Sequence, residues 1–165
     1  MGWLRFLFTV ALYSNASAKY FDAGTSEPIF ETEYGIMVGK QFGDSDVFLG
    51  VPFAKPPVAD LRFKDPEPLE KDKKVRIETK TNKPKCMQNY NKKDGSAQVG
   101  DEDCLYLNIY KPSNTNHEDS LPVLIFFPGG NFLTGGCQNE MYDATILAPD
   151  INAIVVCANY RLGKF

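Results

Sequence analysis

The segment that most constrains this chain is LPVLIFFPGGNFLTGG, at residues 121–136. Its apolar run from Val123 to Phe127 is short, continuous and rich in β-branched and aromatic residues, which predicts a strand buried on both faces inside an α/β sheet. Pro128 donates no N–H and restricts the residue before it, so the strand should end there. Gly129 and Gly130 then leave several backbone N–H groups free to point at one place.

A group of amides at the carboxyl end of a buried strand suits an ester or amide hydrolase, because negative charge develops on the carbonyl oxygen in the transition state. The simpler interpretation is that the Gly-Gly pair only forms a turn. A phosphate-binding loop does not fit: Gly130 and Gly135 have the required spacing, but Gly136 and Cys137 follow where Lys and Ser or Thr are needed. The sequence contains no G-x-G-x-x-G motif either, and we expect no cofactor.

The composition is that of one folded domain. The chain has 165 residues, 43% of them hydrophobic and 13% aromatic, which is enough for a sizeable core. A net charge of −3 and the lack of any Lys/Arg-rich patch argue against nucleic acid or an anionic membrane surface as partners. The single histidine, His117, lies in the polar segment SNTNHEDS, and we expect a solvated loop residue there rather than a base, because no nucleophile flanks it.

Residues 1–18 have the pattern of a secretory signal peptide. A basic residue precedes an apolar run at residues 6–13, and the small residues Ala-Ser-Ala at 16–18 form the predicted cleavage signal. A membrane anchor is the alternative, but this run is shorter than the ~20 residues that a spanning helix needs. We therefore expect a domain of residues 19–165, secreted into an oxidising compartment and without a membrane anchor.

The first half of the chain predicts short strands and covering segments. Glycines and a Gly-Asp turn signal between Ile29 and Gly50 indicate a β-hairpin. The prolines between residues 52 and 68 exclude regular helix and central strand, so an extended covering segment should follow. The polar residues from Glu70 to Lys93 indicate a surface loop. Cys104 to Tyr110 alternates, which predicts a strand with one apolar face formed by Leu105, Leu107 and Ile109.

The second half predicts a βαβ arrangement. Asn139 to Ala148 has the composition of a short helix that ends at Pro149. Ala153 to Ala158 is all apolar and should be a second buried strand. Two buried strands joined by a helical crossover should run parallel, with a right-handed connection.

The four cysteines divide into one expected pair and two others. Cys86 and Cys104 are separated by a polar stretch, and in a secreted chain a disulfide between them is the simplest arrangement, contributing about 3 kcal/mol. Cys157 lies within the predicted strand and should be an inert buried thiol. Cys137 stays unassigned, and a bridge from Cys137 to Cys157 is disfavoured, since one lies in a loop and the other in the sheet interior.

Four segments resemble one family when they are taken together. FLGVPFAKPPVADLRF at 48–63, EDCLYLNIYKP at 102–112, PGGNF at 128–132 and NYRLG at 159–163 occur in the order and approximate spacing of the type-B carboxylesterases and cholinesterase-like proteins. The resemblance covers nearly all of residues 30–165, and EDCLYLN is a family signature. It implies an incomplete α/β-hydrolase fold: the N-terminal strands of a mixed, largely parallel sheet with a small β-hairpin region.

The resemblance also implies structural partners. Cys86 and Cys104 match the first family disulfide, and Arg62 and Glu102 match a partly buried ion pair behind it. Such a pair mainly fixes geometry, because removing one partner costs more than the pair contributes. Arg161 matches a structural arginine whose partner lies further along the family chain.

The oxyanion-hole motif of the family falls on Pro128, Gly129, Gly130 and Asn131. Gly130 and Asn131 match its two amide donors. Asn131 departs from the family pattern, which has Gly or Ala at this position. Its N–H can still donate, but its side chain would project toward the acyl group of a substrate, and we expect this to weaken catalysis.

A further departure decides the functional expectation. Family enzymes attack with the Ser of a G-x-S-x-G motif, assisted by His and an acidic residue, and the 165 residues contain neither that motif nor a suitable His. We expect the N-terminal part of a secreted hydrolase of small-molecule esters, inactive as given. The alternatives are a non-catalytic, esterase-like adhesion module and a half that pairs with a second chain carrying the nucleophile. The oligomeric state stays open.

Overall fold

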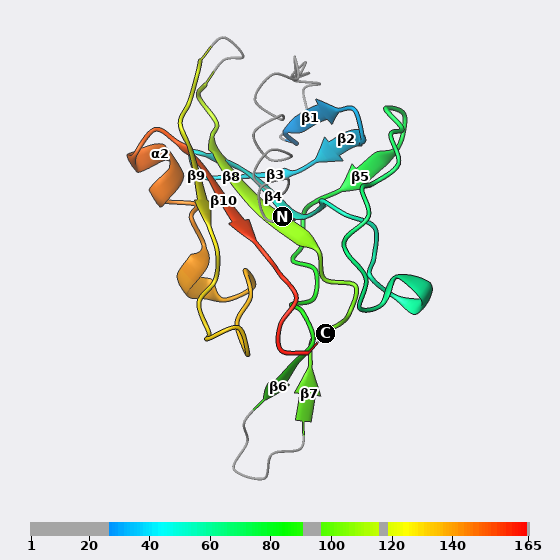
Figure 1. Cartoon of the computed structure of the whole chain (residues 1–165). Helices are drawn as coiled ribbons and strands as arrows, with labels where there is room; N and C mark the ends of the chain where they lie inside the picture. Colours follow the sequence, from blue (N-terminus) through cyan, green and yellow to red (C-terminus); the bar gives the residue numbers. More distant parts are fainter. Residues whose placement is uncertain (1–26, 91–96, 116–118, 165) are drawn as a thin grey trace.

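The computed structural model of the chain describes residues 27–90, 97–115 and 119–164. The predicted signal peptide at 1–18 and the single His117 lie outside these residues. Short strands dominate, and helix is confined to single turns (Figure 1). The elements are β1 (Ile29–Thr32), β2 (Gly35–Val38), β3 (Lys40–Phe42), β4 (Ser45–Pro52), η2 (Ala59–Leu61), β5 (Arg76–Glu78), β6 (Gln88–Tyr90), β7 (Ala97–Val99), β8 (Tyr106–Pro112), β9 (Val123–Phe126), η3 (Glu140–Tyr142), α2 (Leu147–Asp150) and β10 (Ile154–Ala158).

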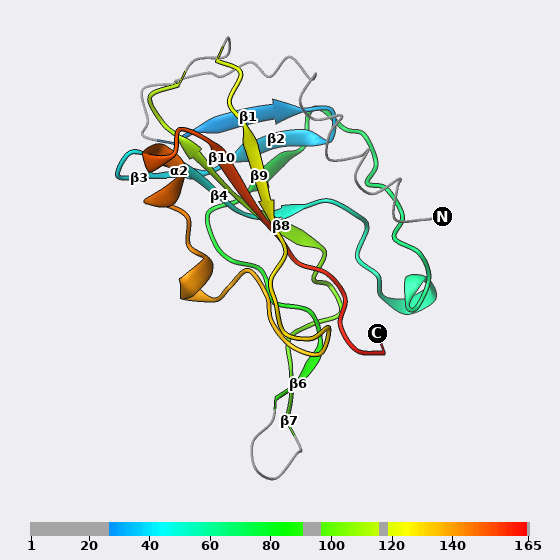
Figure 2. The same ribbon diagram turned by 60° about the vertical axis from the view of Figure 1, so that its left-hand side comes forward.

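A mixed sheet with the strand order β3-β4-β8-β10-β9 is the centre of the fold (Figure 2). β3, β4, β8 and β10 pair antiparallel in succession, and β10 pairs parallel with β9. The parallel arrangement of the last two strands confirms the expectation from the sequence. The β4–β8 register shifts between Leu49 and Val51, where Gly50 adopts a φ of 72° and donates its N–H to Asn108 Oδ1 at 3.0 Å. This bulge increases the local twist of the sheet.

The five-stranded sheet is covered on both faces at β4 and β8. On one face Val47, Leu49 and Tyr110 pack against Ala144 and Ala148, which come from the segment around α2. The three-stranded sheet β1-β2-β5 covers the other face, so the central sheet lies between it and α2 (Figure 1). Three residues form the buried cluster there, and three partly buried ones pack against it: Met37, Phe48 and Val51, with Phe30, Leu107 and Ile109.

The predicted apolar face is present on β8, where Leu107 and Ile109 pack against the buried cluster of Met37, Phe48 and Val51. The opposite side is buried as well, because Asn108 and Tyr110 are only 2% and 3% exposed. The reason is that the chain between β9 and β10 returns over the side of Asn108 and Tyr110. A polar residue in the strand therefore needs partners from that segment.

The expectation of burial on both faces for Val123 to Phe127 is wrong. Among the described strands β9 pairs with β10 alone and forms an edge of the sheet, so Val123 and Leu124 are both 49% exposed and Phe126 is 39% exposed. Burial of such a strand requires a second neighbouring strand and a layer on each face, and the described residues do not supply them. β10, the next strand from this edge of the sheet, is buried as predicted.

The predicted helix from Asn139 to Ala148 is replaced by two short turns. η3 is capped by Asn139, whose Oδ1 accepts the Met141 N–H at 3.1 Å. α2 begins later and contains Pro149 instead of ending before it. Pro149 is tolerated because it lies in the first helical turn, where its missing N–H has no intrahelical partner to lose.

The N-terminal region contains two hairpins in place of the one expected. β1 and β2 join the three-stranded sheet, whereas β3 and β4 join the central sheet. Gly39 lies at the crossing between them, where a Cβ atom would approach the Val47 carbonyl to 2.5 Å. The predicted surface loop from Glu70 to Lys93 is likewise interrupted, because β5 pairs parallel with β2 and β6 pairs antiparallel with β7.

Candidate functional site

The candidate site is the segment of residues 128–137 that follows β9, called here the cradle loop. Gly130, Asn131 and Phe132 adopt φ angles of 145°, 56° and 59°. The turn closes because the N–H groups of Leu133 and Thr134 both donate to the Gly130 carbonyl, at 3.0 and 3.1 Å. A Cβ atom at position 130 would lie 1.8 Å from the Thr134 carbonyl oxygen, so the turn requires glycine there.

The amides at the start of the cradle loop are exposed. Within the described part of the chain, the N–H groups of Gly129, Gly130 and Asn131 have no hydrogen-bond acceptor. Asn is one of the few non-glycine residues that tolerate a positive φ, so the turn at Asn131 keeps its amide accessible at modest cost. Three successive N–H groups are therefore available to donate to an oxygen outside the chain.

Side chains from distant segments fix both ends of the cradle loop. The Tyr160 hydroxyl donates to the Pro128 carbonyl at 2.6 Å. At the far end, the Gly135 N–H donates to Gln88 Oε1 at 3.0 Å, and Gln88 Nε2 donates to the Gly135 carbonyl at 2.8 Å. The Phe132 carbonyl also accepts the Gly163 N–H at 2.7 Å.

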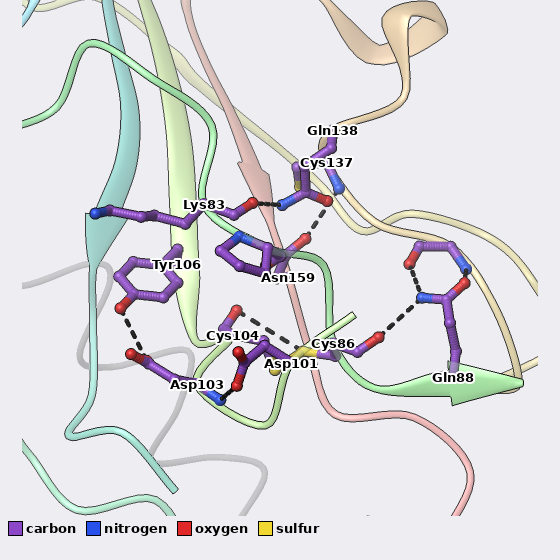
Figure 3. The surroundings of a disulfide bond; sticks show 12 residues. Lys83, Cys86, Gln88, Asp101, Asp103, Cys104, Tyr106, Cys137, Gln138 and Asn159 are labelled. Atoms are coloured by element: carbon purple, nitrogen blue, oxygen red, sulfur yellow. Dashed lines mark hydrogen bonds between the residues drawn. A yellow bond between two sulfur atoms is a disulfide. The ribbon is translucent and has the colours of Figure 1, made fainter. Parts of the chain in front are cut away.

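Cys137 is held by a polar network next to β10 (Figure 3). Its N–H donates to Asn159 Oδ1 at 2.9 Å, and its carbonyl accepts from Asn108 Nδ2 at 3.2 Å. The same Asn108 nitrogen donates to Asn82 at 2.7 Å. Asn108 and Asn159 are each 2% exposed, and this network satisfies their amide groups.

Two disulfides bracket the site. Cys86 is bonded to Cys104, as predicted. Cys137 is bonded to Cys157, so the expectations of an inert thiol at Cys157 and of no bridge between them are wrong. The cradle loop returns to the sheet, and this places Cys137 with its Cα 5.7 Å from that of Cys157. The even number of cysteines behind a predicted signal peptide was the signal that could have indicated this pair.

The residues that resemble a family ion pair lie close together. Arg62 Nη2 is 2.8 Å from Glu102 Oε1, with side chains 46% and 21% exposed, and the Arg62 guanidinium also lies 4.8 Å from the Phe63 ring centroid. At this exposure the pair orients the chain near Cys104 more than it stabilises the fold. Arg161 donates to the Lys64 carbonyl at 2.7 Å.

Two tyrosines on β8 have perturbed acidities. Burial raises the pKa of Tyr110 to about 12, and a smaller contribution comes from the negative charge of Asp143. Burial also raises the pKa of Tyr106, whose hydroxyl donates to Asp103 at 2.8 Å. Both hydroxyls are therefore protonated at neutral pH.

The described ranges hold no cluster of His, Cys, Asp and Glu side chains arranged to bind a metal ion. In the same ranges, none of the helices is long and apolar enough to span a bilayer. The polar groups described at the site are backbone amides, the Tyr160 hydroxyl and the carboxamides of Gln88, Asn108 and Asn159.

The mixed sheet, with a loop of exposed amides after its parallel edge strand, is that of an α/β-hydrolase. Solved esterase structures have the same arrangement. A thermophilic pNB esterase superposes with a TM-score of 0.73 at 34% identity, covering 86% of this chain and 29% of that one. A carboxylesterase from Geobacillus stearothermophilus superposes with a TM-score of 0.70 at 34% identity, covering 82% and 26%.

The chain belongs to the carboxylesterase family, whose sequence profile matches residues 26–165. Liver carboxylesterase 1F of Rattus norvegicus is 37% identical over 177 residues, covering 97% of this chain and 30% of the relative. The cAMP-regulated D2 protein of Dictyostelium discoideum is 38% identical over 165 residues, with the same two coverages of 97% and 30%. The chain thus spans about 30% of the length of these curated relatives.

Proposed function

We propose that this chain supplies the oxyanion-stabilising loop of a carboxylic ester hydrolase. The observation that carries the proposal is the run of exposed amides at Gly129, Gly130 and Asn131, directly after a parallel strand. When a nucleophile attacks an ester, the carbonyl oxygen gains negative charge, and two or more amides aimed at it lower the barrier. The family membership supports this role.

The polypeptide of residues 1–165 should not hydrolyse esters on its own. The sequence contains no G-x-S-x-G motif, and its single histidine, His117, lies in a polar segment away from the cradle loop in sequence. Attack on an ester needs a hydroxyl and a base that removes its proton. Without them, no negative charge develops on the ester carbonyl oxygen, and the amides have nothing to stabilise.

Asn131 shapes what the cradle loop can accept. The residue is exposed and adopts a φ of 56°, and its side chain is larger than the Gly or Ala of the family pattern. We therefore propose a preference for small acyl groups in any longer form of the protein. The same feature favours the second candidate function, a non-catalytic binding module that retains the esterase fold.

We also propose that the protein is secreted after cleavage of residues 1–18. The support from the described part is the pair of disulfides, which form and persist in oxidising compartments. N-terminal sequencing of the protein recovered from culture medium should begin at Lys19. Recovery of the chain only from the cytosol, with its cysteines reduced, would contradict this proposal.

One experiment tests the hydrolase proposal directly. The secreted protein from its native source is treated with a fluorophosphonate probe and assayed with an aryl acetate, in parallel with purified residues 19–165. We expect no labelled serine and no turnover from the 165-residue product. We expect labelling only in material heavier than this product, whose coding sequence continues past Phe165 in frame to a G-x-S-x-G motif.

Two other outcomes separate the alternatives. Saturable hydrolysis by residues 19–165, abolished by replacing one of its serines, would overturn the inactivity of this chain. Heavier secreted material that carries a further domain but reacts with no serine probe would favour the binding module over the hydrolase.

A further inference from the structure

We propose that Gln88 is a positioning residue for the cradle loop, holding its amides in the orientation that an oxyanion requires. The inference rests on the proposed function of this loop. Gln88 lies on β6, in a segment 47 residues before Gly135, and its side chain is not one of the amide donors. Its role would be to act through the backbone of Gly135.

The contacts of Gln88 use both ends of its carboxamide. Oε1 accepts the Gly135 N–H at 3.0 Å, and Nε2 donates to the Gly135 carbonyl at 2.8 Å and to the Cys86 carbonyl at 2.9 Å. The residue is 6% exposed, so water does not compete effectively for these bonds. A side chain that only donates or only accepts cannot hold both polar groups of Gly135.

The backbone that carries Gln88 is itself anchored. Cys86, two residues earlier, is bonded to Cys104, which lies two residues before β8, and both cysteines are buried (Figure 3). The neighbouring Met87 N–H donates to the Asp101 carbonyl at 3.0 Å, and the Asp101 N–H donates to Lys85 at 2.9 Å. The carboxamide of Gln88 therefore projects from a fixed point.

The position of Gly135 controls the amides through direct contact across the loop. A Cβ atom at Gly135 would lie 2.5 Å from the Gly129 carbonyl oxygen, so the two ends of the turn touch through backbone atoms alone. Gly130 is in similar contact with Thr134. When Gln88 fixes Gly135, it therefore also fixes the backbone of Gly129, which lies in contact with Gly135 at the start of the loop.

The test uses ¹⁵N-labelled residues 19–165 with both disulfides intact. The Gln88→Met variant keeps the shape of the side chain and removes all three hydrogen bonds, and Gln88→Glu keeps only an acceptor for the Gly135 N–H. Gln138→Ala is the matched control, since Gln138 Nε2 donates to the Lys83 carbonyl at 2.7 Å and not to Gly135. Backbone hydrogen exchange and order parameters are measured residue by residue.

We expect both Gln88 variants to accelerate exchange of the Leu133 and Thr134 amides at least about tenfold, while amides of β10 change by less than about twofold. The order parameters of Gly130 and Asn131 should fall as well. Gln138→Ala should leave all of these unchanged. Wild-type behaviour of Gln88→Met would overturn the proposal, and so would equal acceleration throughout β10, because Gln88 would then serve only packing or overall stability.

This measurement does not depend on catalysis. If the loop loosens in the Gln88 variants but no longer gene product hydrolyses an ester, the positioning role stands and the hydrolase proposal fails. If a longer product is an active esterase whose Gln88→Met variant keeps wild-type kcat and a wild-type loop, the positioning role fails and the hydrolase proposal stands.

Discussion

The Tyr160 hydroxyl lies 2.6 Å from the Pro128 carbonyl oxygen, which ties the segment after β10 to the first residue of the cradle loop. The Tyr160 ring also packs edge-on against Phe132, with 6.1 Å between ring centroids. One side chain thus contacts the loop on both sides of its exposed amides.

The hydroxyl of Tyr160 should be worth about 1 kcal/mol to the folded chain. Tyr160→Phe keeps the ring and removes only the hydrogen bond to Pro128. We expect a lower urea midpoint with an unchanged slope. Tyr142→Phe is the matched control, since its ring packs against Phe126 and its hydroxyl has no recorded partner among the described residues. Equal midpoints for the two variants would contradict the assigned role.

The Cys137–Cys157 bridge should stabilise the chain by about 3 kcal/mol, because it closes a loop with a sequence separation of 20 in the unfolded state. We expect the Cys137→Ala/Cys157→Ala double variant to unfold at correspondingly lower denaturant concentration. Alkylation of the wild-type chain in denaturant without reductant should modify no cysteine. Two reactive thiols per chain in that assay would show that the bridge does not form.

Asn108 should be among the residues least tolerant of substitution. It accepts the Gly50 N–H at the bulge and donates to Asn82 and to the Cys137 carbonyl. Asn108→Ala leaves several buried polar groups without partners, so we expect a loss of about 3 kcal/mol in the free energy of unfolding. The exposed Asn114, replaced by Ala, should change stability by less than about 0.5 kcal/mol. A mild effect at position 108 would mean that water replaces the amide.

The stability of the chain should fall in alkaline solution. Burial raises the pKa of Tyr110 from 10.0 to about 12 in the folded state, so the folded chain keeps a proton that the unfolded chain releases. The resulting contribution, on the order of 2 kcal/mol, is fully present below pH 10 and is lost as the pH rises through about 12. Denaturant midpoints measured across this range should decline.

Lys111 has the opposite effect on stability. Burial lowers its pKa in the folded chain, so its contribution favours folding as the pH rises toward the ordinary pKa of lysine. Comparison with Tyr110→Phe isolates the tyrosine, because that variant retains Lys111. We expect the decline to be smaller in the variant. The part of the wild-type tyrosinate absorbance that Tyr110→Phe lacks should develop only near pH 12 or as the chain unfolds. A decline of the same size in Tyr110→Phe would assign it to other groups.

The features that the sequence predicts correctly are local or carried by motifs. The parallel strands around residues 123–126 and 154–158, the burial of β10 and the Cys86–Cys104 disulfide all follow from runs of a few residues and from a specific resemblance. The family could be identified for the same reason. These features need little knowledge of where distant segments lie.

The features that the sequence does not predict share a different cause. The exposure of β9 depends on how many strands flank it, and no property of the run from Val123 to Phe127 reports that number. The bridge from Cys137 to Cys157 and the clamp of Gln88 on Gly135 join segments 20 and 47 residues apart, brought together only by the return of the cradle loop. A lone Gln in a polar stretch carries no recognisable signal of such a role.

The strand order has a consequence for synthesis. β10 lies between β8 and β9 in the sheet, although β9 is translated first. Among the described strands β9 pairs with β10 alone, so its apolar stretch emerges from the ribosome before its partner does. This stretch stays accessible to chaperones and to other nascent chains until residue 158 has emerged. Slower translation of the intervening segment would lengthen that interval, so the yield of folded protein should depend on translation speed between residues 127 and 153.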